Sequence, residues 1–113
     1  MKPKITKEIH CPVRKTLEII GGKWTLYIIH QIGNNTIRYG ELKRTVEGIS
    51  EKIFANELKM LVENGIVCKK SYAEIPPRVE YSLTDLGKDF LPIIENLAEI
   101  GKKRFIIENV KIS

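Results

Sequence analysis

The stretch from Ser50 to Gly65 constrains the fold most, because it carries a start signal, a stop signal and the period of a helix. A serine at the start can accept a hydrogen bond from a free N–H of the first turn. A glycine commonly supplies the left-handed residue that ends a helix. At about 100° per residue, the apolar side chains fall on one face. They are Phe54, Leu58, Leu61 and Val62. The pattern predicts a helix with one side packed on a core.

The opposite face of this predicted helix carries Lys52, Asn56 and Lys59, spaced at i, i+4 and i+7. Two cations around an amide suit a helix in the DNA major groove, where lysine binds guanine acceptors and asparagine pairs with adenine. The alternative is an ordinary solvated face, which most amphipathic helices have. The segments on either side are needed to choose between these two interpretations.

Charge and composition narrow the class of protein. The chain has 113 residues and a formal net charge of +5, which is enough length for one domain. The positive excess favours a polyanionic partner, either nucleic acid or an anionic membrane surface. The sequence has no run of about 18 apolar residues and no apolar signal-peptide core, so no membrane span is expected. Two cysteines without an export signal are typical of reduced thiols, so the expected location is the cytoplasm.

The residues before Ser50 predict three helices and a short strand. The helices cover residues 12–20, 23–32 and 41–46, and the strand covers 37–39. The second helix is apolar around almost its whole circumference, so we expect it at the centre of the core. The side chains expected to point inward from the first two helices include Val13, Leu17, Ile20, Trp24 and Tyr27. A break at Glu47-Gly48 then precedes Ser50, which gives the layout of a helix-turn-helix.

A β-hairpin is predicted after Gly65. Residues 66–72 have strand character, and residues 79–83 alternate between apolar and polar side chains. The loop between them contains Pro76 and Pro77, which cannot donate to a strand ladder. The sequence therefore predicts a stiff, exposed tip that presents Arg78.

A last helix is expected from Asp85 to about Phe105, with a kink or a break at Pro92. Its apolar arc is wider than a small monomer needs from a terminal helix. The excess suggests a dimer surface. The alternative is that the helix packs wholly on its own core.

The order of elements predicts a winged helix-turn-helix, which is mainly α with a small β-hairpin. The domain is expected to span residues 11–107, between a flexible arm at 1–10 and a loose tail at 108–113. Groove contacts are expected from Ser50, Lys52, Asn56 and Lys59. Phosphate contacts are expected from Arg38, Lys43, Arg44 and Lys69. Arg78 is expected to reach the minor groove, into which arginine inserts readily.

Several motifs in the same order resemble the signature of HxlR-type winged-helix transcriptional regulators. They are Cys11-Pro12-Val13, Ile20-Gly21-Gly22-Lys23-Trp24-Thr25, Tyr39-Gly40-Glu41-Leu42, Gly48-Ile49-Ser50 and Ile75-Pro76-Pro77-Arg78-Val79-Glu80-Tyr81-Ser82-Leu83-Thr84. The resemblance covers roughly residues 10 to 101. It implies a homodimeric bacterial or archaeal transcription factor without a metal, a cofactor or enzyme activity. Family members dimerise through their first and last helices. The residues this implies for the interface are Val13, Leu17, Phe90, Leu91, Ile94, Leu97, Ala98 and Phe105.

The resemblance also draws attention to Cys11, because in some family members the cysteine of the Cys-Pro-Val motif senses oxidants or electrophiles. A helix N-terminus and the nearby Arg14 and Lys15 would favour a thiolate there. The alternative is a small structural cysteine. Cys68 is expected to be structural, and it could pair with Cys11 only if their Cα atoms approach within about 7 Å.

The sequence therefore predicts a dimeric, sequence-specific regulator that binds double-stranded DNA at a pseudo-palindromic operator. The alternative is a winged-helix module that binds another protein and no DNA. RNA binding is a minor possibility, because no strand face carries an aromatic stacking platform. The chain has no spaced set of metal ligands and no nucleophile–base motif, so no metal site and no enzyme activity are expected. A small-molecule effector is left unidentified.

Overall fold

The structure is a computed structural model that describes residues 11–107. Its elements follow the predicted order. They are α2 (Pro12–Ile20), α3 (Thr25–Ile32), β1 (Ile37–Arg38), α4 (Tyr39–Thr45), α5 (Glu51–Glu63), β2 (Val67–Tyr72), β3 (Arg78–Leu83), α6 (Asp85–Lys88) and α7 (Phe90–Ile107). The strands form one antiparallel sheet in the order β1-β3-β2. This confirms the predicted winged helix-turn-helix. The arm and tail predicted at 1–10 and 108–113 lie outside the described residues.

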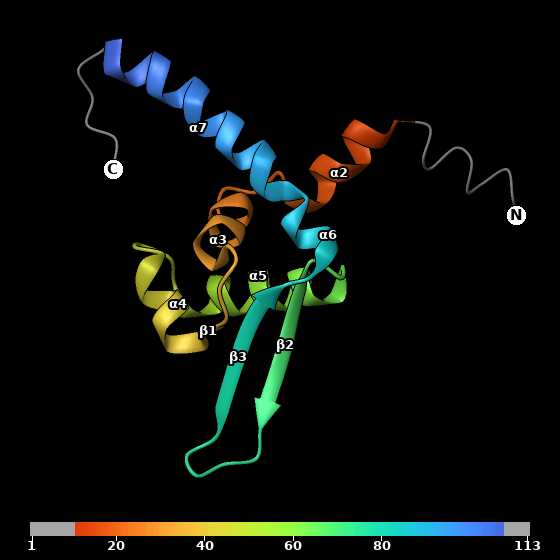
Figure 1. Ribbon diagram of the computed structural model, residues 1–113, viewed down its shortest axis with the longest axis vertical. Coiled ribbons are helices and arrows are strands. Elements are labelled where there is room, and N and C mark those ends of the chain that lie inside the picture. The colour runs from red at the N-terminus through yellow and green to blue at the C-terminus, as the bar shows by residue number, and fades with distance from the viewer. Residues whose placement is uncertain (1–10, 108–113) are drawn as a thin grey trace, which may run out of the picture.

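The two ends of the molecule differ in shape (Figure 1). Helices α2 and α7 diverge at one end, and the β2–β3 hairpin projects from the other. Helix α3 lies between them and packs on α7, α4 and β3. Neither α7 nor any other helix in residues 11–107 has the length and apolarity needed to cross a membrane.

Helix α3 is the centre of the core, as predicted. Ile28, Ile29 and Ile32 of this helix are fully buried. They belong to one cluster with buried side chains of the neighbouring elements. These are Leu42 of α4 and Val46 just after it, Phe54, Leu58 and Leu61 of α5, and Tyr81 and Leu83 of β3. The prediction that Tyr27 points inward is wrong: its ring is exposed, and its hydroxyl donates to the carbonyl oxygen of Thr45 at 3.3 Å.

Helix α5 begins and ends at the predicted signals. The Ser50 hydroxyl oxygen accepts a hydrogen bond from the Ile53 N–H at 3.1 Å. Gly65 has a φ of 73°, in the left-handed region that favours glycine. The turn from α4 to α5 contains Gly48, whose φ is 86°. Both ends of the predicted recognition helix are therefore fixed by local chemistry.

The last helix is broken, but the break lies before the proline. Helix α6 ends at Lys88, and α7 begins at Phe90. Pro92 is then the third residue of α7. The N–H groups of the first turn have no partner within a helix, so the missing N–H of proline breaks no helical hydrogen bond there. Thr84 caps α6, because its hydroxyl oxygen accepts a hydrogen bond from the Gly87 N–H at 3.0 Å. Its O–H donates to the Gly65 carbonyl oxygen at 2.6 Å, which ties the start of α6 to the turn after α5. A Cβ on Gly87 would collide with the carbonyl oxygen of Ile66, so α6 packs tightly on the turn between α5 and β2.

Candidate nucleic-acid interface

The predicted groove-reading face of α5 is uncovered. Lys52, Asn56 and Lys59 are all exposed, and no hydrogen bond or ion pair joins their side chains to another residue in the part of the chain that is described. The opposite face of the helix is buried in the core. Their donors are therefore available to an external partner.

Helix α4 is tied to the first turn of α5 through Tyr39. Its hydroxyl donates to Oε2 of Glu51 at 2.7 Å, and its ring meets Phe54 edge-on with 5.1 Å between centroids. Burial, followed by the hydrogen bond to Glu51 and the charge of that carboxylate, raises the pKa of Tyr39 to about 12. The phenol therefore stays a neutral donor at neutral pH and holds the two helices in a fixed relation.

A groove of about 530 Å³ separates α5 from the hairpin. Helix α5 contributes Ala55, Val62 and Lys59 to its wall, and the hairpin contributes Lys69 and Tyr81. Lys59 was predicted for base contact and Lys69 for phosphate contact. The fold brings both cations to the same groove from elements on either side of it.

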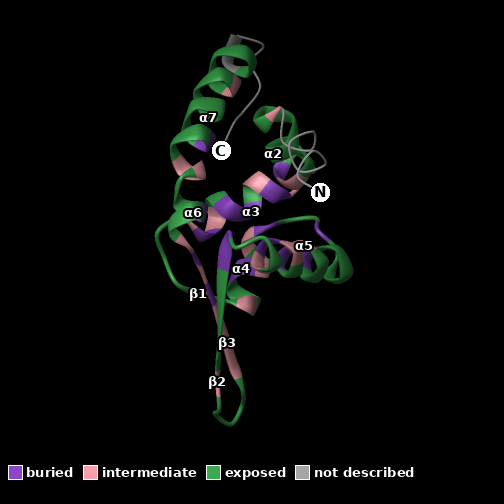
Figure 2. Ribbon diagram, turned by 90° about the vertical axis from the view of Figure 1, so that its right-hand side faces the viewer, coloured by how far each residue is buried: buried purple, intermediate pink, exposed green. Residues whose placement is uncertain are grey.

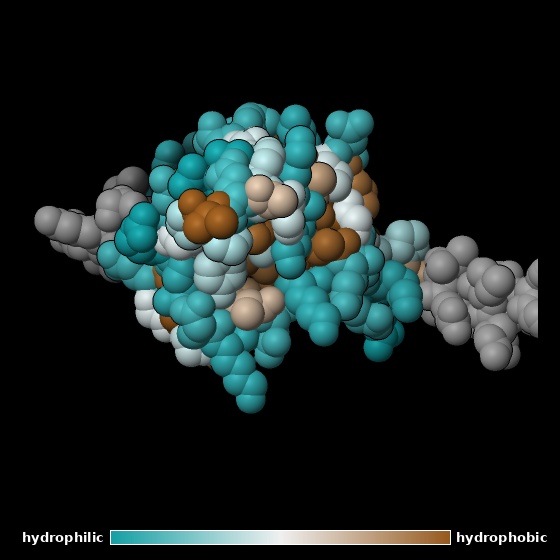
Figure 3. Space-filling view, turned by 90° about the horizontal axis from the view of Figure 1, so that it is seen from below, coloured by the Kyte–Doolittle hydropathy of each residue, from teal (hydrophilic) through white to brown (hydrophobic). Residues whose placement is uncertain are grey.

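A second hollow of about 450 Å³ continues along the hairpin. It shares Lys69 and Tyr81 with the first and is also lined by Arg38 and Arg78. Three cationic side chains predicted for DNA contact therefore meet around one concave surface. The hairpin end of the molecule is mainly hydrophilic, and its apolar side chains form small separate groups (Figure 3).

The placement predicted for Arg78 is wrong. It is the first residue of β3 and not part of the tip. Its guanidinium stacks on the Tyr72 ring at 3.9 Å and pairs with Glu74 at 3.1 Å and Glu80 at 3.7 Å. The two carboxylates, four residues before and two residues after, were the signal in the sequence that this arginine is engaged within the hairpin. The loop outside it exposes Ile75 and the two prolines.

The other predicted contacts are spread more widely. Ser50 is exposed at the start of α5, although its oxygen already caps the helix. Lys43 and Arg44 lie in the last turn of α4 and line neither of the two hollows. Tyr39 and Tyr81, which the sequence did not single out, line both hollows.

Apolar side chains are exposed at the opposite end of the molecule. Val13 and Leu17 of α2 are 69% and 54% exposed, so the prediction that they point into their own core is wrong. Leu97 and Ile100 of α7 are 48% and 61% exposed. Both helices are coloured as exposed along most of their length (Figure 2). These side chains are candidates for an interface.

The predicted interface residues fall into two groups. Five of them are exposed: Val13, Leu17, Leu97, Ala98 and Phe105. The other three pack on the chain's own core, where Phe90 and Leu91 are half-buried and Ile94 is only 8% exposed. Ile94 therefore belongs to the protomer, while the exposed Ile93 and Ile100 join the apolar surface.

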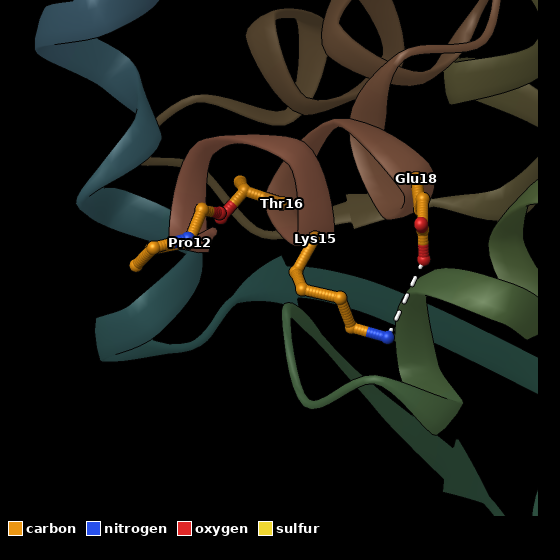
Figure 4. A network of polar contacts seen from close by, with 4 residues as sticks. All are labelled: Pro12, Lys15, Thr16 and Glu18. Carbon is orange, nitrogen blue, oxygen red and sulfur yellow. Dashed lines mark hydrogen bonds and ion pairs between the residues drawn. The ribbon is translucent and has the colours of Figure 1, made fainter. Parts of the chain in front are cut away.

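Cys11 lies immediately before α2, and both it and Cys68 are free thiols. Of the two positive charges that follow Cys11, the Lys15 ammonium forms an ion pair with Glu18 at 3.4 Å (Figure 4). The Thr16 hydroxyl donates to the Pro12 carbonyl oxygen at 2.8 Å. Within residues 11–107, no cluster of three or more His, Cys, Asp or Glu side chains could hold a metal ion.

The comparisons with known proteins agree with this geometry. The family model of the HxlR-like helix-turn-helix matches residues 19–108. The HTH-type transcriptional regulator BH0655 of Halalkalibacterium halodurans is 43% identical over 103 residues, which cover 90% of this chain and 91% of the relative. A MarR-family transcriptional regulator of Porphyromonas gingivalis W83 is similar in structure with a TM-score of 0.79, 59% identity, and coverage of 80% of this chain and 89% of the other. The oxidised redox regulator HypR gives a TM-score of 0.77 and 35% identity, covering 82% of this chain and 96% of its own. The chain therefore belongs to the HxlR-like helix-turn-helix family of DNA-binding transcriptional regulators.

Proposed function

We propose that two copies of this chain bind a pseudo-palindromic operator in double-stranded DNA and regulate transcription from it. The observation that carries this proposal is the uncovered face of α5. Lys52, Asn56 and Lys59 have no partner in the described part of the chain, and their helix is held on its other side by the core. Asn56 pairs with adenine and the lysines with guanine acceptors in the major groove.

The DNA backbone beside that major groove follows the concave surface between α5 and the hairpin. Lys69 lines this surface, and Arg38 lines the second hollow beside it, so both side chains are placed where they can contact phosphates. Lys43 and Arg44 at the end of α4 contact the backbone further along. For Arg78 to reach the minor groove, its guanidinium must exchange Glu74 and Glu80 for DNA.

The second copy binds through the exposed apolar surface of α2 and α7. Burying such a surface is the main favourable term in association, and a two-fold axis lets the same patch serve both copies. The hairpin and α5 lie at the end away from that surface, as Figure 1 shows, so dimerisation leaves them free. The two α5 helices then enter successive major grooves about 34 Å apart. We place this regulator in the cytoplasm.

Cys11 makes the regulator responsive to thiol oxidants in this proposal. The supporting observations are its position at the start of α2, beside the apolar surface, and the likeness to HypR, which is named a redox regulator. Oxidation of Cys11 would alter α2 and hence the pairing of the two copies. DNA binding with and without a thiol oxidant tests this: the response should vanish in Cys11→Ser and persist in Cys68→Ser.

The test of DNA binding is a titration of labelled duplex at two salt concentrations. The duplex is first selected by the wild-type chain from a random library, and a scrambled duplex of the same composition serves as reference. Affinity should fall steeply with salt, because phosphate contacts release counterions. No binding to either duplex at low salt would instead favour a module that binds another protein.

Base reading is tested by Asn56→Ala, with Asn96→Ala on α7 as the matched control. Asn56→Ala should weaken binding to the selected duplex by about tenfold or more, since a good base contact discriminates by about 1–3 kcal/mol. It should leave the scrambled duplex almost unchanged. Equal loss on both duplexes would contradict base reading by Asn56.

A further inference from the structure

The residue Thr25, at the start of α3, is a buried polar side chain that DNA contact does not explain. It is only 1% exposed. A buried hydroxyl is costly unless it is hydrogen-bonded. Its Oγ1 donates to Oε1 of Glu57 at 2.9 Å, across 32 residues of sequence. This bond joins the central helix of the core directly to α5.

The position of Glu57 shows which flank of α5 this hydrogen bond holds. At about 100° per residue, Glu57 lies about 60° round the helix from the buried Phe54. It is on the flank away from Ala55 and Val62, which line the groove beside the hairpin. The hydrogen bond therefore holds the side of α5 that the hairpin does not reach.

The absence of a side chain at Gly22 leaves room for this hydrogen bond. A Cβ on Gly22 would lie 3.0 Å from Oγ1 of Thr25 and 4.0 Å from Oε2 of Glu57. Contact at 3.0 Å is tighter than ordinary packing, so any larger residue at this position would push on the hydroxyl. Gly22, in the link between α2 and α3, therefore leaves the hydroxyl and the carboxylate free to meet.

We propose that Thr25 and Glu57 are positioning residues that fix the rotation of α5 about its own axis. The apolar packing of the buried face of α5 is non-directional. A hydrogen bond, in contrast, has a preferred length and angle. With side chains about 5–6 Å from the helix axis, a rotation of about 10° moves them by about 1 Å. That displacement is enough to break a base contact while leaving flexible lysines within reach of phosphates. This inference rests on the proposed function.

The experiment compares the affinities for the selected and the scrambled duplex in Thr25→Val, which keeps the shape of the side chain and removes the hydroxyl. The ratio of the two affinities should fall about tenfold, the scale of one base contact. The slope of affinity against salt should stay as in the wild type, because the phosphate contacts are the same. Thr25→Ser restores the donor and should restore the ratio.

A second variant, Glu57→Ala, removes the acceptor from a half-buried position on α5 and keeps the inference testable if Thr25→Val does not fold. The ratio of affinities is the readout, because loss of a carboxylate strengthens binding to every duplex alike. A normal ratio in both Thr25→Val and Glu57→Ala, with a wild-type chain that binds DNA, would overturn this inference and leave the proposed function standing. A wild-type chain that binds neither duplex would overturn the proposed function itself, and this inference with it.

Discussion

Replacing Leu97 by alanine should weaken the dimer by about 30-fold. Leu97 is 48% exposed in the protomer. Burying a whole leucine side chain contributes about 1.5–3 kcal/mol, so the exposed half contributes about 1 kcal/mol. A two-fold interface contains the residue twice, which gives about 2 kcal/mol for the pair. At about 1.4 kcal/mol for each factor of ten, this is about 30-fold in the dissociation constant.

The assay is sedimentation equilibrium over a range of protein concentrations. Ile75→Ala is the matched control, because it removes an exposed apolar side chain from the hairpin tip, at the other end of the molecule. It should leave the dissociation constant unchanged. The reasoning would be refuted by a wild-type chain that stays monomeric at micromolar concentrations, or by equal weakening in Leu97→Ala and Ile75→Ala.

Three further predictions concern the DNA-facing end. Ser50→Ala should lower the free energy of unfolding in urea by about 1 kcal/mol through loss of the helix cap, and Ser50→Asp should not. Because the folded state raises the pKa of Tyr39 from 10 to about 12, its contribution to stability is complete below pH 10 and is lost as the pH rises towards 12. Between pH 10 and pH 12, the melting temperature should therefore fall less in Tyr39→Phe than in the wild type. Lys69→Ala should reduce the salt slope of DNA binding by about two, because each of the two copies loses one phosphate contact. Arg78→Ala should reduce it by less, because that guanidinium already faces Glu74.

Each of these predictions has a contrary outcome. Unchanged stability in Ser50→Ala would mean that water replaces the cap. Identical loss between pH 10 and 12 in Tyr39→Phe would assign the effect to other groups. An equal or larger change in slope for Arg78→Ala than for Lys69→Ala would show that the arginine leaves its carboxylates when DNA binds.

The sequence predicted those features that neighbouring residues decide. Ser50 and Gly65 mark the ends of α5 because capping and a left-handed residue are local requirements. The alternation in residues 79–83 predicted β3, which is confirmed. The periodicity around Phe54 predicted the buried face of α5, and the same count identified Lys52 and Asn56 as exposed.

Features decided by distant contacts were missed. On α7, periodicity could not separate Ile94 from Leu97, because only the packing of α3 on α7 decides which one is covered. The link from Thr25 to Glu57 spans 32 residues, and no local pattern indicates it. The sequence placed Arg78 in the tip because it follows Pro76 and Pro77. Its place in β3 is instead accompanied by ion pairs with Glu74 and Glu80.

The strand order has a consequence for how the hairpin can be altered. Strand β3 lies between β1 and β2 in the sheet, so within the described residues one edge of β2 has no neighbouring strand. Open edges invite a strand of another molecule, and lysines discourage such pairing. Lys69 and Lys70 occupy adjacent positions there. A variant neutral at both would become prone to aggregation through this edge, so these lysines should be replaced one at a time.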